Sequence, residues 1–104
     1  MIHLKTMDPY SDLKQNFYVF PELFDTVHDF QLELVSENSV EKALLFRRKY
    51  NGSTAGFAYV VCKDTELDLG AFRMIFGHYS RVVREYGKRD FKEVDLYVVC
   101  KNAT

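Results

Sequence analysis

Residues 54–62 form a stretch without a charged side chain, and no other feature of the sequence constrains the fold so strongly. Its aromatic and β-branched residues are typical of a central β-strand. Side chains alternate between the two faces of a strand, and here both alternating sets are apolar. Such a strand is either covered on both faces, or covered on one face and used for binding on the other. The function of this chain depends on which of the two holds.

Length and composition predict one globular domain that spans residues 1–104. A chain of 104 residues with 47% apolar and 28% charged residues can bury a core without disulfides or metals. Cys62 and Cys100 fall in predicted strands without metal-ligand spacing, so we expect buried thiols and no cofactor. The sequence has neither a membrane-spanning apolar run nor a signal-peptide pattern. We therefore expect an intracellular, cytoplasmic protein that does not act at a membrane.

The first third of the chain allows two interpretations. Ile2 and Leu4 alternate with polar residues and predict a short edge strand. Apolar spacing over residues 11–33 fits one kinked helix, or a strand at 16–20 followed by a helix from Pro21 to about residue 32. The second is favoured because an interior proline costs a helix ~3 kcal/mol, whereas at the first helical position it costs little.

The remaining elements have clearer signals. Asn51-Gly52 is a strong hairpin signal because both residues tolerate positive φ, and it pairs residues 42–50 with 54–62 in antiparallel fashion. A helix begins near Asp64 or Thr65 and ends near Gly87, and residues 93–100 form a last strand. One face of that helix is apolar. Its members are Phe72, Ile75, Phe76, Tyr79, Val82, Val83 and Tyr86.

This order of elements predicts an α+β fold. Strand, helix, strand, strand, helix, strand is the order of a ferredoxin-like βαββαβ sandwich, which has an antiparallel sheet with both helices on one face. The alternative is a helix, a three-stranded meander, a helix and a final strand. The first arrangement leaves one face of the sheet open.

Two short segments resemble the motifs of RNA recognition motif (RRM) domains. Gly56-Phe57-Ala58-Tyr59-Val60 resembles the octapeptide on the third strand of that family, and Phe17-Tyr18-Val19-Phe20 resembles the motif on its first strand. The resemblance implies that Phe57, Tyr59 and Tyr18 stack bases on an open sheet face. Ala55 stands where the family carries Arg or Lys, so the usual phosphate contact is missing.

Basic residues define two further candidate surfaces. Residues 1–46 carry a net charge of −5 and residues 47–104 carry +4. Arg47, Arg48 and Lys49 lie beside the predicted hairpin and are the cations placed to reach an aromatic sheet face. A second basic surface lies on the predicted helix, opposite its apolar face. Its members are Arg73, Arg81, Arg84 and Lys88.

We expect a non-enzymatic binding module. His3, His28 and His78 fall in different predicted elements, and the sequence has no glycine-rich phosphate loop or nucleophile motif, so no catalytic residue or metal ligand is expected. The first hypothesis is binding of single-stranded RNA on the aromatic face. The alternative is a small protein-binding adaptor or inhibitor, of the kind that viruses and mobile elements encode. It would act through the aromatic face or the basic helix surface, with a homodimer possible.

Overall fold

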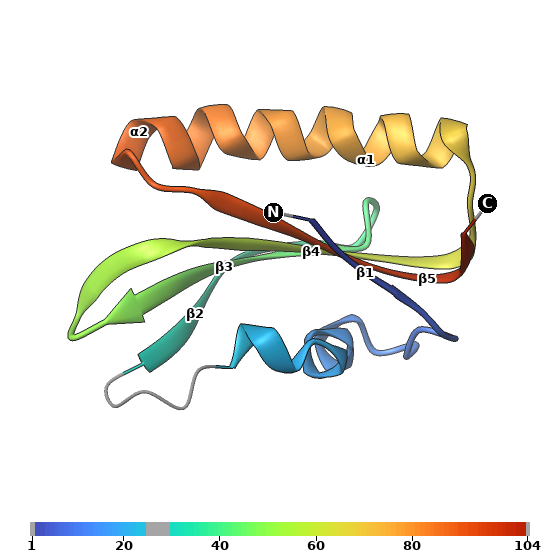
Figure 1. The fold of residues 1–104 in the computed structure, drawn as a ribbon, viewed down its shortest axis with the longest axis horizontal. Coiled ribbons are helices and arrows are strands. Elements are labelled where there is room, and N and C mark those ends of the chain that lie inside the picture. The colour runs from blue at the N-terminus through green and yellow to red at the C-terminus, as the bar shows by residue number, and fades with distance from the viewer. Residues whose placement is uncertain (1, 25–29, 104) are drawn as a thin grey trace.

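A five-stranded mixed sheet with helices on both faces organises the computed structural model, which describes residues 2–24 and 30–103 (Figure 1). The strands are β1 (Ile2–Thr6), β2 (Phe30–Asn38), β3 (Ala43–Tyr50), β4 (Ser53–Leu67) and β5 (Val94–Ala103). The helices are the 3-10 helices η1 (Leu13–Val19) and η2 (Pro21–Leu23), α1 (Leu69–Val82), the π-helical turn η3 (Val83–Gly87) and the short α2 (Lys88–Asp90). The spatial order of the strands is β1-β5-β4-β3-β2.

Two kinds of connection build this sheet. β2, β3 and β4 form an antiparallel meander. The turn between β3 and β4 has the predicted geometry, because Asn51 and Gly52 both have positive φ (51° and 78°). β5 pairs in parallel with β4, and α1 provides the crossover between them. β1 is confirmed as an edge strand and pairs in parallel with β5.

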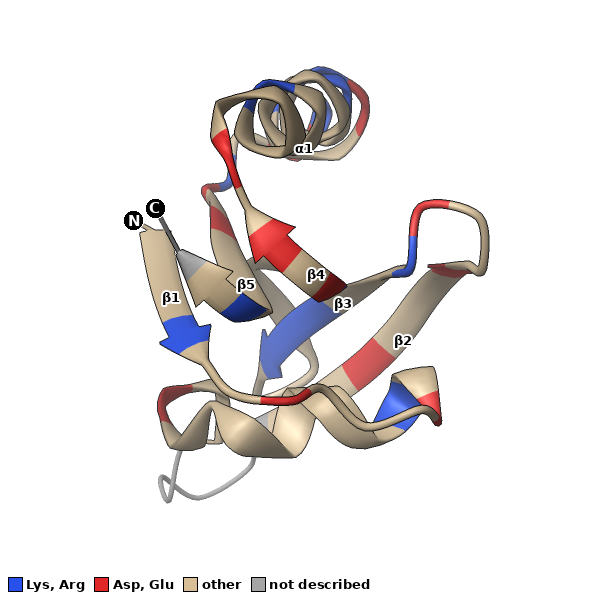
Figure 2. Cartoon of the chain, turned by 90° about the vertical axis from the view of Figure 1, so that its right-hand side faces the viewer, with Lys and Arg blue, Asp and Glu red and all other residues tan. Residues whose placement is uncertain are grey.

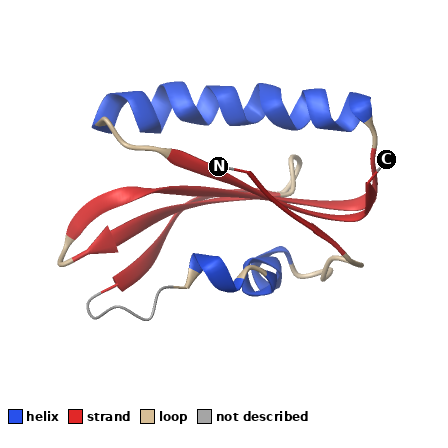
Figure 3. Cartoon of the chain, in the orientation of Figure 1, coloured by secondary structure: helices blue, strands red, loops and turns tan. Residues whose placement is uncertain are grey.

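β4 is buried on both faces. Its odd-numbered side chains Phe57, Tyr59 and Val61 pack in the core beneath α1. The even-numbered Ala58, Val60 and Cys62 belong to a second core beneath η1 and η2, and none of the six exceeds 4% exposure. Figure 3 shows the long helix on one side of the sheet and the short helices on the other. Of the two alternatives that the sequence allows, β4 is therefore the strand that is covered on both faces, with neither face left open for binding.

The helix after β4 keeps its predicted apolar face but begins later than expected. β4 continues to Leu67, which is 4% exposed, because that side chain still packs in the core. Asp68 then caps α1 by accepting a hydrogen bond from the backbone N–H of Ala71 at 2.8 Å. Ile75 and Val82 are buried against the sheet. The helix continues through η3 and α2 as far as Asp90.

The α+β class is confirmed, but the ferredoxin-like order is not. Residues 13–19 form η1 rather than a strand from residue 16, and helical structure after Pro21 ends at Leu23. Residues 25–29 of the predicted helix lie outside the described residues, and β2 begins at Phe30. Both helical layers were expected on one face, whereas they cover opposite faces. The order from η1 onward is that of the alternative arrangement, with 3-10 helices in place of its first helix.

Local polar contacts cap η1 and hold the preceding loop against it. Asp12 caps it through the N–H of Lys14 at 3.2 Å. Asn16 is 1% exposed, and its side chain both accepts from the N–H of Tyr10 (2.7 Å) and donates to the carbonyl of Tyr10 (2.9 Å). These bonds fold the preceding loop onto η1. Pro21 takes the first position of η2, where its missing N–H costs nothing.

Both cysteines are buried free thiols, as expected, and they face opposite cores. Cys62 lies on the side of η1, whereas Cys100 lies on the side of α1. None of the helices in the described ranges is both long enough and apolar enough to cross a membrane.

Gly87 is required by the return of the chain from α2 to β5. A Cβ atom there would lie 2.9 Å from the carbonyl oxygen of Lys92 and 3.0 Å from Val94 Cγ2. We expect Gly87→Ala to lower the free energy of unfolding by ~1–3 kcal/mol in urea denaturation, because backbone must shift. Gly77→Ala is the matched control in the same helix, since nothing lies within 4 Å of its Cβ position. It should raise stability by ~1 kcal/mol. Equal effects of the two substitutions would contradict this account.

Candidate functional site

The expected aromatic platform is not on the surface. Phe57 and Tyr59 are 1% and 4% exposed, and both rings lie in the core beneath α1. The Phe57 ring contacts Tyr86 of η3 at a centroid distance of 5.9 Å. The expectation of an open face at these rings is wrong, because the crossover from β4 to its parallel neighbour β5 carries α1 over that face.

Tyr18 lies in the opposite layer, so the three predicted stacking residues are not brought together. It belongs to η1 and is 60% exposed. Its ring stacks on Phe24 with centroids 5.6 Å apart and an angle of 11°, and it contacts Phe17 at 4.1 Å. The sheet separates this cluster from Phe57 and Tyr59.

The cations beside the hairpin are engaged by acidic neighbours. Arg47 and Lys49 lie on the α1 face and meet Glu33 of β2 at 2.7 and 3.4 Å. Arg48 points to the other face and meets Asp95 of β5 at 3.6 Å. Hydrogen bonds and charge from Lys49 and Arg47 hold the pKa of Glu33 below its ordinary value. Arg47 and Lys49 therefore tie β3 to its neighbour β2, whereas Arg48 reaches across β4 to β5.

A carboxylate that the sequence analysis missed forms the best-defined polar cluster. Glu41, in the turn between β2 and β3, accepts hydrogen bonds from Tyr59 Oη (3.1 Å) and Arg81 Nη2 (3.2 Å), and His78 Nδ1 lies 3.0 Å from it. The Glu41 side chain is only 12% exposed. Tyr59 of β4 and Arg81 of α1 donate to its oxygens and the His78 imidazole lies beside them, so the cluster clamps the turn onto the helix. The sequence signal was limited to the i, i+3 spacing of His78 and Arg81.

The outer face of α1 retains most of the predicted basic surface. Arg73, Arg84 and Lys88 are exposed, and none of them forms an ion pair within the described part of the chain. Arg81 differs because it turns toward Glu41. Between the three cations lie two small exposed residues, Gly77 and Ser80. Figure 2 shows basic residues on the side of α1 that faces away from the sheet.

The arrangement does not suggest a metal centre. In residues 2–24 and 30–103, no three His, Cys, Asp or Glu side chains are close enough to hold an ion. No family model, curated protein or solved structure matches this chain. What the protein does is therefore inferred from the geometry and charge of its own residues.

Burial predicts opposite outcomes for two of the expected stacking residues. Phe57→Ala should lower the free energy of unfolding by ~3–5 kcal/mol, because it leaves a cavity beneath α1. Tyr18→Ala, at an exposed ring, should cost less than about 1 kcal/mol. Urea denaturation of the two variants beside the unchanged protein measures both. A Phe57→Ala variant as stable as Tyr18→Ala would show that the ring does not lie in the core.

Alkaline pH should destabilise the fold through buried acids that are neutral when protonated. Burial raises the pKa of Cys62 to about 12. Burial, with the nearby Glu41 carboxylate, also raises the pKa of Tyr59 above its ordinary value. Between the pKa of the unfolded chain and the raised pKa of the folded state, the Cys62 thiol and the Tyr59 hydroxyl keep their protons only in the folded protein. Their contribution to the free energy of unfolding is therefore complete below about pH 8.5, and it is lost as pH rises through the raised pKa values.

The urea midpoint, measured from neutral pH to pH 11, should therefore fall as the solution becomes alkaline. Tyr59→Phe removes one of the titrating groups, and its midpoint should fall less steeply over the same range. Parallel curves for the two proteins would contradict the role assigned to Tyr59.

Proposed function

We propose that this chain is a non-enzymatic protein-binding module, an adaptor or inhibitor, that docks an acidic partner on the outer face of α1. The observation that carries the proposal is the row formed by Arg73, Arg84 and Lys88, three exposed cations without an ion-pair partner in the described structure. The opposite face of the helix is committed to the core.

The spacing of the row suits a protein surface. Arg73 and Lys88 are fifteen residues apart, which is about 22 Å along a helix. This length fits within the patch that one partner of a standard protein interface contributes. One exposed ion pair contributes little to the free energy of binding. Several together orient the partner and raise the association rate.

Gly77 supports contact with another molecule at the middle of the row. A mid-helix glycine costs ~1 kcal/mol relative to alanine, and no neighbour within 4 Å would exclude a Cβ atom there. The packing of the fold therefore gives no reason for a glycine. Gly77 and Ser80, one turn apart, have small side chains, so the backbone of a partner can come close to the helix between the cations.

Charge favours a protein over a nucleic acid. The chain has a net charge of −1 and a pI near 6.3, and the acids concentrate in its first half. The excess of acids in residues 1–46 would repel a phosphate backbone that extended beyond the basic residues of the second half. Stacking of bases would need exposed rings, and Phe57 and Tyr59 are buried beneath that same helix.

Paired charge reversals test the proposal. Arg73→Glu/Arg84→Glu should abolish retention of the partner protein from a nuclease-treated lysate, and retention by the unchanged chain should weaken as salt is raised. Lys5→Glu/Lys101→Glu alters two exposed cations on β1 and β5 by the same charge, and it should retain the partner. Circular dichroism and the melting temperature Tm establish that both variants fold.

Two outcomes would overturn the proposal. Equal retention by the two double variants would remove the helix face from the interface. Retention that disappears on nuclease treatment would identify a nucleic acid as the ligand.

A further inference from the structure

Phe91 is an apolar knob at one end of the molecule. It follows α2, is 92% exposed, and has the left-handed conformation with φ 54°. Helices commonly end with a residue in this conformation, but that residue is usually glycine or asparagine. A bulky residue there is strained, and its exposed ring gains nothing from the core. Strain that the fold does not need is a reason to look for function.

A hydrogen-bonded turn fixes the backbone of the knob, and bases outnumber acids around it. The N–H of Lys92 donates to the carbonyl of Gly87 at 2.9 Å, which closes the turn around Phe91. Residues 88–93 carry three exposed bases, Lys88, Arg89 and Lys92, against Asp90 and Glu93, and Arg89 meets Asp90 at 3.4 Å. A backbone that is fixed before binding loses little entropy when the ring is buried.

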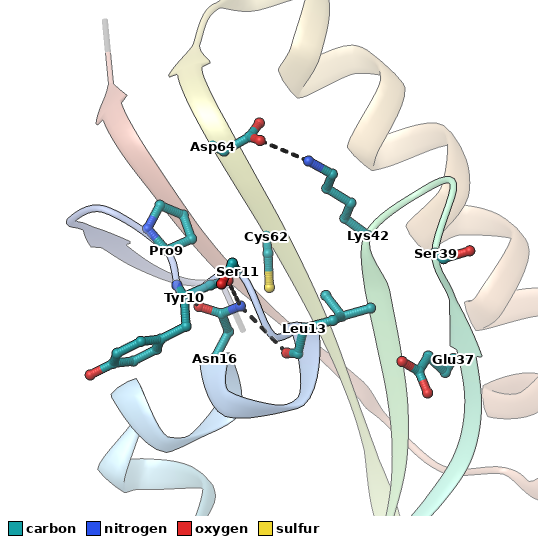
Figure 4. A pocket seen from close by; sticks show the side chains of 10 residues that line it. All are labelled: Pro9, Tyr10, Ser11, Leu13, Asn16, Glu37, Ser39, Lys42, Cys62 and Asp64. Carbon is teal, nitrogen blue, oxygen red and sulfur yellow. Dashed lines mark hydrogen bonds and ion pairs between the residues drawn. The ribbon is translucent and has the colours of Figure 1, made fainter.

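A cavity of about 330 Å³ lies toward the other end of the molecule, between the loop before η1 and the meander. Figure 4 shows the Cys62 thiol between Leu13 and Asn16 in this cavity. Pro9 and Tyr10 line it from the loop, and the hydrogen bonds of Asn16 to Tyr10 fix that wall.

This socket matches the knob in size and charge. A dry cavity of ~150 Å³ in another protein binds benzene, so about 330 Å³ leaves room for a phenylalanine ring. Two carboxylates, Glu37 and Asp64, lie among its lining residues. Each is also near a lysine: Lys14 lies 3.7 Å from Glu37, and Lys42 lies 2.8 Å from Asp64. The exposed Asp8 and Asp12 flank the lining loop, so acids outnumber bases around the socket.

Backbone strain marks both places. Among the described residues, the non-glycine positions with positive φ are Lys42, Asn51 and Phe91. Asn51 belongs to the hairpin turn, where asparagine is favoured. Lys42 lines the socket and Phe91 is the knob. Figure 1 places the α2 end and the loop before η1 at opposite ends of the long axis, so one chain cannot fill its own socket.

We propose that the chain associates with itself head to tail, with Phe91 of one copy inserted beside Cys62 of the next. The occupant of the socket is thus a second copy of this chain. Such an interface is heterologous, and it leaves one free knob and one free socket in every open assembly. The contact shares Lys88 with the basic row on α1 but does not use Arg73 or Arg84, so Arg73→Glu/Arg84→Glu should leave self-association unchanged and separates the two proposals.

Sedimentation equilibrium of the purified protein tests self-association. The average mass of the unchanged chain should rise with concentration and fall as salt is added. Phe91→Gly should sediment as a monomer at the same concentrations. Its Tm should rise by several degrees, because glycine relieves the strained position. The opposite changes in association and Tm separate a binding role of the ring from a structural one.

A mixture of two variants tests the head-to-tail geometry. Glu37→Lys/Asp64→Lys reverses the socket carboxylates, whose side chains are 38% and 65% exposed, so the fold should survive. Alone, this variant and Phe91→Gly should each be monomeric. Mixed in equal amounts, they should form a dimer that does not grow, because one supplies the knob and the other the socket. With a two-fold interface the mixed dimer would recover only one of the two contacts and would be weaker than the dimer of the unchanged chain, whereas a head-to-tail contact is recovered in full.

Three results would overturn the proposal. The first is an unchanged chain that stays monomeric up to its solubility limit. The second is a Phe91→Gly variant that associates as strongly as the unchanged chain. The third is a mixture of the two variants that remains monomeric while both are folded.

Discussion

Two-sided burial of β4 is the constraint on which the rest of the structure depends. Its side chains from Phe57 to Cys62 offer no polar face, so the sheet needs cover on both sides. α1 covers one face, and η1 with η2 covers the other. A binding surface therefore has to lie on the outside of the covering layers, at the ends of the molecule or along the strand edges.

The parallel pairing of β4 and β5 decides where those outer surfaces lie. A parallel connection needs a crossover, and α1 provides it by running across the sheet. The crossover buries the apolar side of the helix and turns Arg73 and Arg84 to solvent. It also ends in the tight return at Gly87, which projects Phe91 from the end of the molecule.

The turn between β2 and β3 connects the polar features to the fold. Glu41 is held by donors from β4 and α1, and its neighbour Lys42 reaches Asp64 beside the cavity at Cys62. This turn thus contacts α1 through Glu41 and forms part of the cavity wall through Lys42. The contacts of Glu41 and Lys42 join residues that are 18 to 40 positions apart in the sequence, so a pattern search over short windows could not detect the arrangement.

The sequence by itself determined the elements whose signals are local: the Asn51-Gly52 hairpin, the apolar face of α1 and the edge strand β1. Its prediction of a helix as far as about residue 32 is wrong from Phe30 onward, where β2 begins. Only the tertiary structure decided that α1 covers Phe57 and Tyr59. A strand that is apolar on both faces indicates that each face is covered, but it does not indicate which segment covers it. Burial by distant segments is a property of topology, and so the exposed aromatic residues in the described part of the chain include Tyr10, Tyr18, Phe24 and Phe91 but not Phe57 or Tyr59 of β4.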